Sequence, residues 1–394
     1  MMNAMKNVEN NPLDMAGQWF GKSYSYESKT TSLIVVNIEP RFPQKALLVG
    51  MEYPSQTRTL AEATIELKDE TFVGKTNNFQ IYDESSHAVI PLSVFCEKYQ
   101  VQGEPANEAE YLGTFDGNKL AGTWKNNLGQ TGTFELRRSF SEATYGLSLP
   151  EPKEIIPLNW EEFKRHIAGF RLKGRVLFRG QHSNKYPVRT SFHRRGRNNL
   201  QAYLVNDVQR LRHQINAISP HYYQPTVEDL YGLLNLAQHH GFPTPFLDWT
   251  ESPYVAAFFA FDCLTEKEKW LSKPDREPVR IFTFDLEAWR NVNRKLAQSL
   301  NDPCPDFQFF HPPANNNPRY YPQQSMAAFS NIDRIEDYIA AYEASEKKTF
   351  LTRIDILATE RTTVEDELRF MGITPATLFP GFEGACKSLR AELF

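Results

Sequence analysis

Short segments in which polar and apolar residues alternate fill the chain from residue 14 to about residue 140. A period of two residues is typical of a β-strand with one buried face. The predicted strands cover residues 32–38, 45–51, 63–67, 71–73, 79–82, 111–115, 119–124 and 132–137. Turn-forming residues such as Asp116-Gly117-Asn118 separate neighbouring segments, as in antiparallel hairpins. The pattern predicts a β-rich domain over residues 14–140.

Tryptophan and glycine recur at both ends of this region. Trp19 lies between Gly17 and Gly21, and Trp124 follows Gly122. A closed antiparallel barrel with a tryptophan near its first strand would remove exposed sheet edges and would loosely resemble lipocalin-like barrels. A β-sandwich with the tryptophans in its core fits the same pattern, so both architectures stay open. This half contains no constellation of chemically active residues, and we expect a sensing or docking module with a ligand or partner of its own.

The pattern changes after a proline-rich stretch. Residues 147–158 contain Pro150, Pro152 and Pro157, which exclude a continuous helix and predict a linker over residues 141–158. Beyond it, apolar residues recur at steps of three and four, which is typical of amphipathic helices. Asn159 and Glu162 have the spacing of a capping box. One long helix is predicted over residues 200–218.

Helices and strands are interspersed in the rest of the chain. Thr226 and Asp229 have a capping spacing at the start of a second helix, and Gly241 supplies its stop. Strand-like runs cover residues 175–178, 279–284 and 350–356. We therefore predict an α+β chain, in which an antiparallel all-β barrel or sandwich precedes a mixed α+β domain over residues 159–394.

Composition narrows the class of protein. The 394 residues are 41% hydrophobic and 23% charged, which is enough for two domains with apolar cores. No apolar run approaches the roughly 20 residues that span a bilayer, and residues 1–18 lack the apolar stretch of a secretory signal. The four cysteines, Cys96, Cys263, Cys304 and Cys386, lie far apart, so we expect reduced thiols, a cytoplasmic location and no membrane partner. A net charge of −4 disfavours a protein that coats nucleic acid.

Three local patterns in the second half concentrate polar and aromatic residues. The first is Leu177-Phe178-Arg179-Gly180-Gln181-His182, where a short apolar strand ends in an arginine followed by a glycine. The second includes Gln238-His239-His240-Gly241-Phe242-Pro243-Thr244 and Asp248-Trp249-Thr250-Glu251-Ser252-Pro253, and then runs into a small apolar segment. The third combines Asn317-Pro318-Arg319-Tyr320 and Gln323-Gln324 with Leu378-Phe379-Pro380-Gly381.

Together these patterns resemble the FRG domain, a family named for its Phe-Arg-Gly motif. The resemblance covers about residues 159–390, because the opening triplet, the long central block and the terminal Leu-Phe-Pro occur in family order. Two positions depart from the family pattern: Pro245 stands where an arginine is usual, and Ser325-Met326 replaces a glycine-containing stretch. The resemblance suggests a bacterial setting, where such domains would serve in conflict systems such as phage defence.

The motif order is also similar to that of ADP-ribosyltransferases. Those enzymes place an arginine on a first core strand, a Thr/Ser strand before a small apolar helix, and a Glu or Gln near a later strand. The likeness implies NAD as the substrate and an unknown protein or nucleic acid as the acceptor. Transfer of ADP-ribose requires a grip on a pyrophosphate, a pocket for nicotinamide and stabilisation of a ribosyl cation.

Residues near the first two motifs are candidates for these tasks. Arg179 is a candidate for the pyrophosphate or a ribose because a guanidinium donates two parallel hydrogen bonds, although a structural ion pair with Asp248 fits equally. Thr250 is a candidate ligand contact. Trp249 and Tyr254 are candidates for stacking on a ring, and the same aromatic residues also suit a core. Ser252 before a proline has the pattern of a helix cap, a position that also attracts anions.

The remaining candidates lie at a predicted helix end and in the third motif. Gln324 is where the likeness places a residue on the ribose hydroxyls, although a neutral Gln stabilises a cation less than a carboxylate does. Gln323 and Glu383 are possible substitutes. His240 is a candidate general base, or would orient Asp248. Because adjacent histidines point apart and no third ligand has a convincing spacing, we expect no metal.

The resulting set of candidates has two parts. Those for catalysis are Arg179, His240, Asp248 and Gln324, and those for substrate binding are Gln181, His239, Trp249, Thr250, Ser252 and Tyr254.

Several functions compete for this set of residues. An NAD-dependent ADP-ribosyltransferase is the leading hypothesis, and an NAD glycohydrolase would use the same pocket with water as the acceptor. A non-enzymatic module would bind a nucleotide or partner, with Arg179, His240 and Asp248 as an internal polar network. The basic run His193-Arg194-Arg195-Gly196-Arg197 suggests nucleic-acid binding as a further rival. Phosphate-loop, dinucleotide-fingerprint, nucleophile-elbow and zinc-protease motifs are all absent from the sequence.

Overall fold

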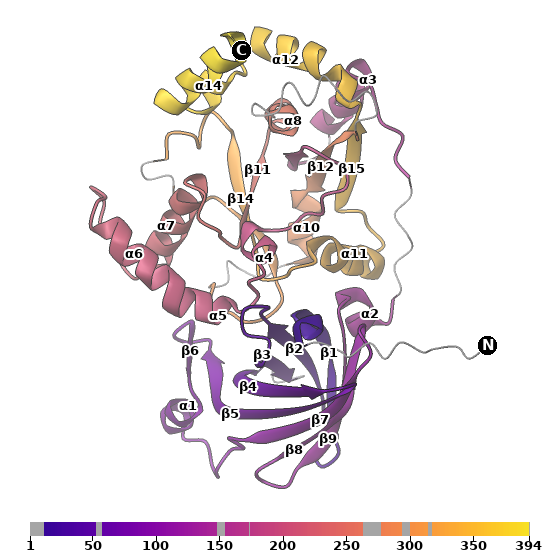
Figure 1. Ribbon diagram of the computed structural model, residues 1–394, viewed down its shortest axis with the longest axis vertical. Coiled ribbons are helices and arrows are strands. Elements are labelled where there is room, and N and C mark those ends of the chain that lie inside the picture. Colours follow the sequence, from indigo (N-terminus) through magenta and orange to yellow (C-terminus); the bar gives the residue numbers. More distant parts are fainter. Residues whose placement is uncertain are drawn as a thin grey trace, which may run out of the picture.

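A computed structural model describes residues 12–52, 57–147, 154–172, 174–262, 277–293, 300–313 and 317–393. The first part of the chain forms a barrel, and the rest forms a sheet covered by helices, which lies above the barrel in Figure 1. The predicted α+β class is therefore confirmed. Within the described ranges, each helix is too short or too polar to cross a membrane. Part of the predicted linker, residues 148–153, lies outside the described residues.

The N-terminal strands close into an antiparallel barrel. They pair in the order β4-β3-β2-β1-β9-β8-β7-β5, and β4 pairs again with β5, so that eight described strands form a ring. A hairpin outside the ring adds β6 to β5, and α1 (Leu92–Tyr99) follows it. The strands are β1 (Gly17–Ser25), β2 (Thr31–Ile38), β3 (Lys45–Glu52), β4 (Arg58–Lys68), β5 (Thr71–Asp83), β6 (Ala88–Pro91), β7 (Ala109–Phe115), β8 (Lys119–Asn126) and β9 (Thr131–Arg137). Of the two architectures left open, the chain adopts the barrel.

Irregular pairing explains where the predicted strands differ from the observed ones. The separate strands predicted at residues 71–73 and 79–82 are one strand, β5. Its register with β4 shifts between Leu60 and Glu62, and Asn78 has a φ of 58° there. A bulge of this kind breaks the period of two within a continuous strand. β1 shows little alternation because most of its residues are buried.

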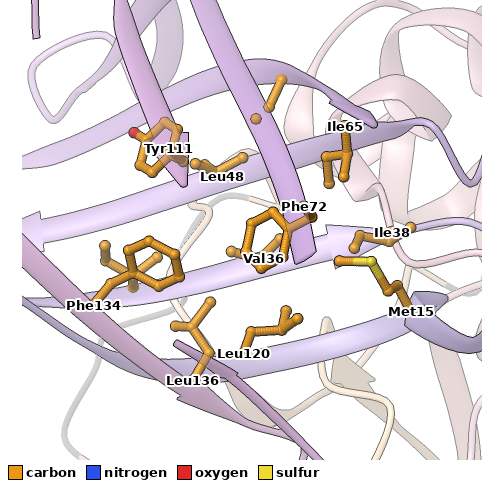
Figure 2. A pocket seen from close by; sticks show the side chains of 13 residues that line it. Met15, Val36, Ile38, Leu48, Ile65, Phe72, Tyr111, Leu120, Phe134 and Leu136 are labelled. Atoms are coloured by element: carbon orange, nitrogen blue, oxygen red, sulfur yellow. The ribbon is translucent and has the colours of Figure 1, made fainter. Parts of the chain in front are cut away.

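The barrel interior is a hydrophobic core. Val36, Phe72, Phe134 and Leu136 converge from strands around the ring (Figure 2). The remaining cavity has a volume of about 40 Å³ and is lined by apolar and aromatic side chains. Because this space suits little more than a water-sized group, any partner of the barrel is expected on its outer surface.

Outward-facing side chains of the barrel form a second core with the rest of the chain. Phe20, Val35 and Val49 belong to the same buried cluster as Trp289 and Tyr338 from the other half. Since successive residues of a strand point to opposite faces, β2 and β3 need apolar residues at nearly every position. The continuous apolar runs at residues 33–36 and 46–49 meet that need.

Two carboxylates, the buried Glu39 and the partly buried Asp337, fasten the barrel to the other half. Glu39, which follows β2, accepts hydrogen bonds from Arg197 Nε at 2.9 Å and from the backbone N–H groups of Asn198 and Asn199 at 3.1 and 3.0 Å. Asp337 of α11 (Ile335–Glu346) accepts hydrogen bonds from the start of α2 (Phe140–Tyr145), which follows the last barrel strand. The junction therefore combines apolar packing with satisfied polar groups.

The second half is built on an antiparallel sheet. Its described strands lie in the order β13-β14-β11-β10-β12-β15. They are β10 (Val176–Gln181), β11 (Phe246–Thr250), β12 (Val279–Asp285), β13 (Phe307–Phe310), β14 (Ser325–Ser330) and β15 (Leu351–Ile356). One face packs against α3, α8 and α12, and the other packs against α10, α11 and the barrel. The strand-like runs predicted at 175–178, 279–284 and 350–356 correspond to β10, β12 and β15.

The helices of this half begin and end largely where capping residues predict. The α-helices not yet given are α3 (Trp160–Ala168), α4 (Ser191–Arg194), α5 (Leu200–Ala202), α6 (Val208–Asn216), α7 (Val227–His239), α8 (Pro253–Phe261), α10 (Leu286–Val292), α12 (Arg361–Phe370), α13 (Pro375–Leu378) and α14 (Phe382–Leu393). Asn159 and Glu162 form the predicted capping box. The long helix predicted over residues 200–218 is interrupted by a π-helical segment, η3 (Tyr203–Asp207), and Ile218 lies beyond its end, 82% exposed.

A close contact between α8 and β10 depends on a glycine. A Cβ atom added at Gly180 would overlap the carbonyl oxygen of Ala256 and lie 2.8 Å from the backbone nitrogen of Ala260. The helix presents small residues to the strand, since Ala256, Ala257 and Ala260 are all fully buried. Glycine at position 180 therefore allows the helix to lie directly on the central strand.

We predict that Gly180→Ala destabilises the protein more than Gly241→Ala does. Gly241 has a φ of 83° and open space around its Cβ position, so alanine there costs about 1 kcal/mol of backbone strain. Alanine at position 180 must displace α8, which costs roughly 2–3 kcal/mol or more. Chemical denaturation of both variants measures the difference. Equal losses of unfolding free energy would contradict the close contact.

We also predict acid sensitivity from a buried histidine. His193 is fully buried, and its Nδ1 lies 2.7 Å from Thr190 Oγ1. Burial lowers the pKa of His193 to about 4, in spite of the nearby Asp333 carboxylate. In the unfolded chain this imidazole takes up a proton near pH 6.5, whereas in the folded protein it does so only near pH 4. The free energy of unfolding therefore falls by roughly 3 kcal/mol as the pH is lowered from 6.5 toward 4.

The test is to measure the free energy of unfolding at pH 7 and pH 4.5 for the parent protein and for His193→Gln. His213→Gln is the control, because His213 is exposed on α6. His193→Gln should lose less stability on acidification than the parent protein. His213→Gln should follow the parent. The same acid loss in all three proteins would show that His193 is not responsible.

Candidate functional site

The sheet of the second half opens at its centre, between β10 and β11. Within these described strands, pairing is confined to one position, Phe178 with Thr250. Beyond it, β10 continues along β12, while β11 continues along β14. A cavity of about 360 Å³ lies where the two strands part.

Residues from all three sequence motifs line this cavity. The lining combines charged, amide and aromatic groups: Phe178, Arg179, Gly180, His182, Gln238, His239, Asp248, Trp249, Thr250, Ala256, Phe259, Asp262, Arg319, Gln323, Ser325 and Phe379. Five of the predicted site residues are among them: Arg179, His239, Asp248, Trp249 and Thr250. The parting of the strands thus brings together segments that are far apart in sequence.

Arg179 spans the gap between the two strands. Its Nη1 donates a hydrogen bond to the backbone oxygen of Asp248 at 2.6 Å, and its buried Nε has no hydrogen-bond partner among the described residues. Burial lowers the pKa of Arg179 to about 10, although the Asp248 charge opposes this effect. The guanidinium therefore stays charged at neutral pH and keeps an unused donor. It binds the carbonyl of Asp248 rather than forming the carboxylate ion pair considered from sequence.

A hydrogen-bonded chain fixes the carboxylate of Asp248. Its Oδ1 accepts a hydrogen bond from Gln238 Nε2 at 2.6 Å. The Oε1 of Gln238 accepts a hydrogen bond from the hydroxyl of Thr244 in turn. This second contact sets which end of the Gln238 amide faces Asp248. A neutral donor thus orients the carboxylate without neutralising its charge.

The two neighbouring histidines lie in different environments. His239 lines the cavity, and its Nε2 lies 3.0 Å from Nδ2 of Asn317, which places its proton on Nδ1. Burial lowers the pKa of His239, although the Asp248 charge opposes this, so the ring is neutral at pH 7. His240 caps the end of α7, is exposed and lies outside the cavity lining.

Two predicted ligand contacts use their hydroxyl groups within the fold. Thr250 Oγ1 donates to the backbone oxygen of Gln323 at 2.7 Å and accepts from the backbone N–H of Ser252 at 3.1 Å. Ser252 caps α8 by accepting from the N–H of Val255 at 3.2 Å. The sequence interpretation of Ser252 as a helix cap is therefore confirmed, and Thr250 joins β11 to the segment before β14.

The remaining predicted residues lie outside this cavity. Gln181 is buried and donates to the backbone oxygen of Pro187 at 3.4 Å. Tyr254 lines a second cavity of about 380 Å³ beside Phe170. Trp249, by contrast, is one of the lining residues, but it belongs to the main core, and its indole packs against Phe284.

The sequence predicted that Gln324 lies in the site, but its neighbour Gln323 takes that position. Gln324 is exposed and has a φ of 45°, whereas Gln323 lines the cavity and is buried. Nε2 of Gln323 donates to the backbone oxygen of Leu378 at 2.9 Å, which joins this segment to α13. The left-handed backbone of Gln324 turns the chain at this point. The spacing of the motif therefore does not show which of the two side-chain amides faces the cavity.

Sequence reasoning missed several lining residues. Arg319 and Phe379 belong to the third motif, which marks the segment but not the orientation of either side chain. Asp262 follows α8 without any local signal, and burial raises its pKa, although nearby Lys387 opposes this. His182 lies 3.2 Å, through Nδ1, from the backbone oxygen of Ala260.

The basic run after α4 is partly used in structural contacts. Arg197 pairs with Glu39 at 2.9 Å and with Asp207 at 2.6 Å. Arg194 and Arg195 are exposed. In the part of the chain that the structure describes, no three His, Cys, Asp or Glu side chains are grouped so as to hold a metal ion.

The comparison with protein families supports the resemblance predicted from the motifs. Residues 174–269, which run from the start of β10 past α8, match the family described as the FRG domain. No curated protein matches the chain. Two matching solved structures are a redesigned β-barrel, mFAP1, bound to DFHBI (15% identity, 32% of this chain and 96% of that chain, TM-score 0.22) and a fluorescence-activating β-barrel of de novo design (14%, 31% and 92%, TM-score 0.21). Residues 174–269 are thus similar to the FRG domain family, and these matched residues supply most of the cavity wall.

We predict that Thr250→Val lowers stability by roughly 2 kcal/mol, because the backbone groups of Gln323 and Ser252 both lose a partner in a buried setting. Thr250→Ser keeps the hydroxyl and should lose much less. Thermal and chemical denaturation of the two variants measures the difference. If Thr250→Val is as stable as the parent protein, the hydroxyl does not hold the strands in this way.

Proposed function

We propose that the cavity between β10 and β11 binds NAD and that the protein transfers ADP-ribose from it to an acceptor in the cytoplasm. The observation that carries the proposal is the charged guanidinium of Arg179, whose Nε has no partner among the described residues and which spans the opening beside the fixed carboxylate of Asp248. NAD combines an anionic pyrophosphate with a ribose that becomes cationic on reaction. The cavity lining presents groups of both complementary charges, the cations Arg179 and Arg319 and the carboxylates Asp248 and Asp262.

Arg179 is the proposed pyrophosphate contact. A guanidinium offers a planar set of donors that matches phosphate oxygens, and Nε of Arg179 has no hydrogen-bond partner among the described residues. Because the guanidinium is partly buried, its attraction for an anion is screened less than at the surface. The aromatic rings of Phe259 and Phe379, 6.0 Å apart at the cavity wall, offer apolar surface for a base or nicotinamide ring.

Asp248 is the proposed stabiliser of the reacting ribose. The bond between the ribose and nicotinamide breaks, its electron pair leaves with nicotinamide, and positive charge develops on the ribose. A fixed carboxylate stabilises such charge without having to reorganise. This assigns to Asp248 the role for which Gln324 was considered from sequence. The acceptor then attacks the ribose and loses a proton. In a bacterial host, consumption of NAD of this kind would suit a defence effector against phage.

We predict that Asp248→Asn lowers nicotinamide release from NAD by at least about 100-fold with a small effect on NAD affinity, because the lost interaction forms mainly in the transition state. The measurement is nicotinamide release by the purified protein, alone and with a cell lysate as acceptor source. Asp366→Asn, on an exposed part of α12, is the matched control and should keep full activity.

The same experiment separates the rival functions. Release that requires lysate supports transfer, whereas equal release without lysate indicates an NAD glycohydrolase. If the folded parent protein releases no nicotinamide under either condition, the proposed activity fails. NAD binding without turnover would then favour a non-enzymatic nucleotide-binding module.

A further inference from the structure

At the wall of the cavity, a carboxylate from the C-terminal helix is bound between two positively charged side chains. Arg319, which lines the cavity, donates through Nη2 to Oε2 of Glu383 on α14. Oε1 of the same carboxylate lies 3.2 Å from Nζ of Lys387, one turn further along the helix. Glu383 therefore lies between two cations.

An aromatic ring supports both cations. Cζ of Arg319 lies 5.2 Å from the centre of the Phe379 ring, and Nζ of Lys387 lies 3.9 Å from it. Such contacts hold a cation in place beyond what an ion pair alone provides. Phe379 is itself anchored, because the neighbouring carbonyl of Leu378 accepts the hydrogen bond from Gln323. The two positive groups are thus positioned by the cavity wall and do not depend on Glu383 alone.

Both cations pair with one carboxylate. Arg319 and Lys387 carry two positive charges, and Glu383 supplies the negative charge that pairs with both, while the Asp262 carboxylate, whose pKa burial raises, lies near Lys387. Although partial burial opposes it, the hydrogen bond from Lys387 lowers the pKa of Glu383, and so does the charge of Arg319, so the carboxylate is ionised at neutral pH. The side chain of Arg319 is 17% exposed, whereas that of Glu383 is 47% exposed. Glu383 can therefore turn toward solvent while Arg319 stays in the wall.

We propose that Arg319, Lys387 and Phe379 form a phosphate subsite, and that Glu383 occupies it until a phosphate group of the ligand takes its place. A phosphate group offers more acceptor oxygens than a carboxylate and suits a pair of cations. The identity of the ligand as NAD rests on the proposed function, but recognition of phosphate does not. Glu383 thereby sets the affinity of the cavity by competing with the ligand.

Ligand binding would also tie α14 to the body of the protein. The helix is largely exposed, with Phe382 and Leu389 at 94% and 55% exposure. Its Glu383 contact joins it to Arg319 across 64 residues of sequence. A phosphate group held by both Arg319 and Lys387 would replace that link with a stronger one.

Inorganic pyrophosphate is the probe for this subsite, titrated into the full chain by calorimetry at fixed ionic strength. Glu383→Gln removes the competing charge and should tighten pyrophosphate binding at least fivefold. Arg319→Gln and Lys387→Gln should each weaken it at least tenfold. Because Lys387 lies on an exposed helix, that variant keeps the test valid even if Arg319→Gln fails to fold. Glu392→Gln, the same change elsewhere on α14, is the matched control and should bind like the parent.

An unchanged or weaker affinity in Glu383→Gln would overturn the proposal, as would failure of pyrophosphate to bind to any of these proteins. Hydrogen exchange gives a second readout: pyrophosphate should slow exchange along α14 in the parent protein and not in Lys387→Gln. The outcome is separable from that of the NAD assay. Nicotinamide release without any effect of Glu383→Gln on pyrophosphate affinity leaves the proposed function standing and removes the subsite. The reverse result retains the subsite and removes the activity.

Discussion

The single pairing of Phe178 with Thr250 determines the arrangement of the second half. Had β10 and β11 paired along their whole length, the sheet would be continuous and Arg179 would face a neighbouring strand. Because they part, Arg179 crosses the gap to the carbonyl of Asp248, while Thr250 joins β11 to the segment before β14 through the carbonyl of Gln323. The cavity is thus a consequence of how the strands pair, and the guanidinium of Arg179 supplies a hydrogen bond across the gap where the ladder is missing.

Local signals in the sequence were sufficient for some elements and residues. The caps at Asn159 and Ser252 and the strand that carries Arg179 follow from side-chain chemistry within a few residues, and the structure contains them. Arg179, Asp248 and His239 were found through the motifs in which they lie. β11 and β14, by contrast, show no clear alternation because both are buried on both faces. Their role in the sheet follows from packing, which a local pattern does not reveal.

Other features of the site and the barrel depend on three-dimensional contacts, which the spacing of residues along the sequence does not show. Which of His239 and His240 faces the cavity depends on where α7 ends, and the choice between Gln323 and Gln324 depends on one left-handed residue. Asp262 and Arg319 join the site through contacts with segments far away in the chain. The same holds for the barrel, where a sandwich and a closed ring differ by the pairing of β4 with β5.

The outer wall of the barrel has a consequence for how the chain unfolds. Phe20, Val35 and Val49 share a buried cluster with Trp289 and Tyr338, so separation of the halves would expose apolar surface on both. Heat or denaturant should then disrupt both halves in one cooperative step, with no stable barrel left behind. For the same reason, either half transplanted alone into another protein would bring an exposed apolar surface that promotes aggregation.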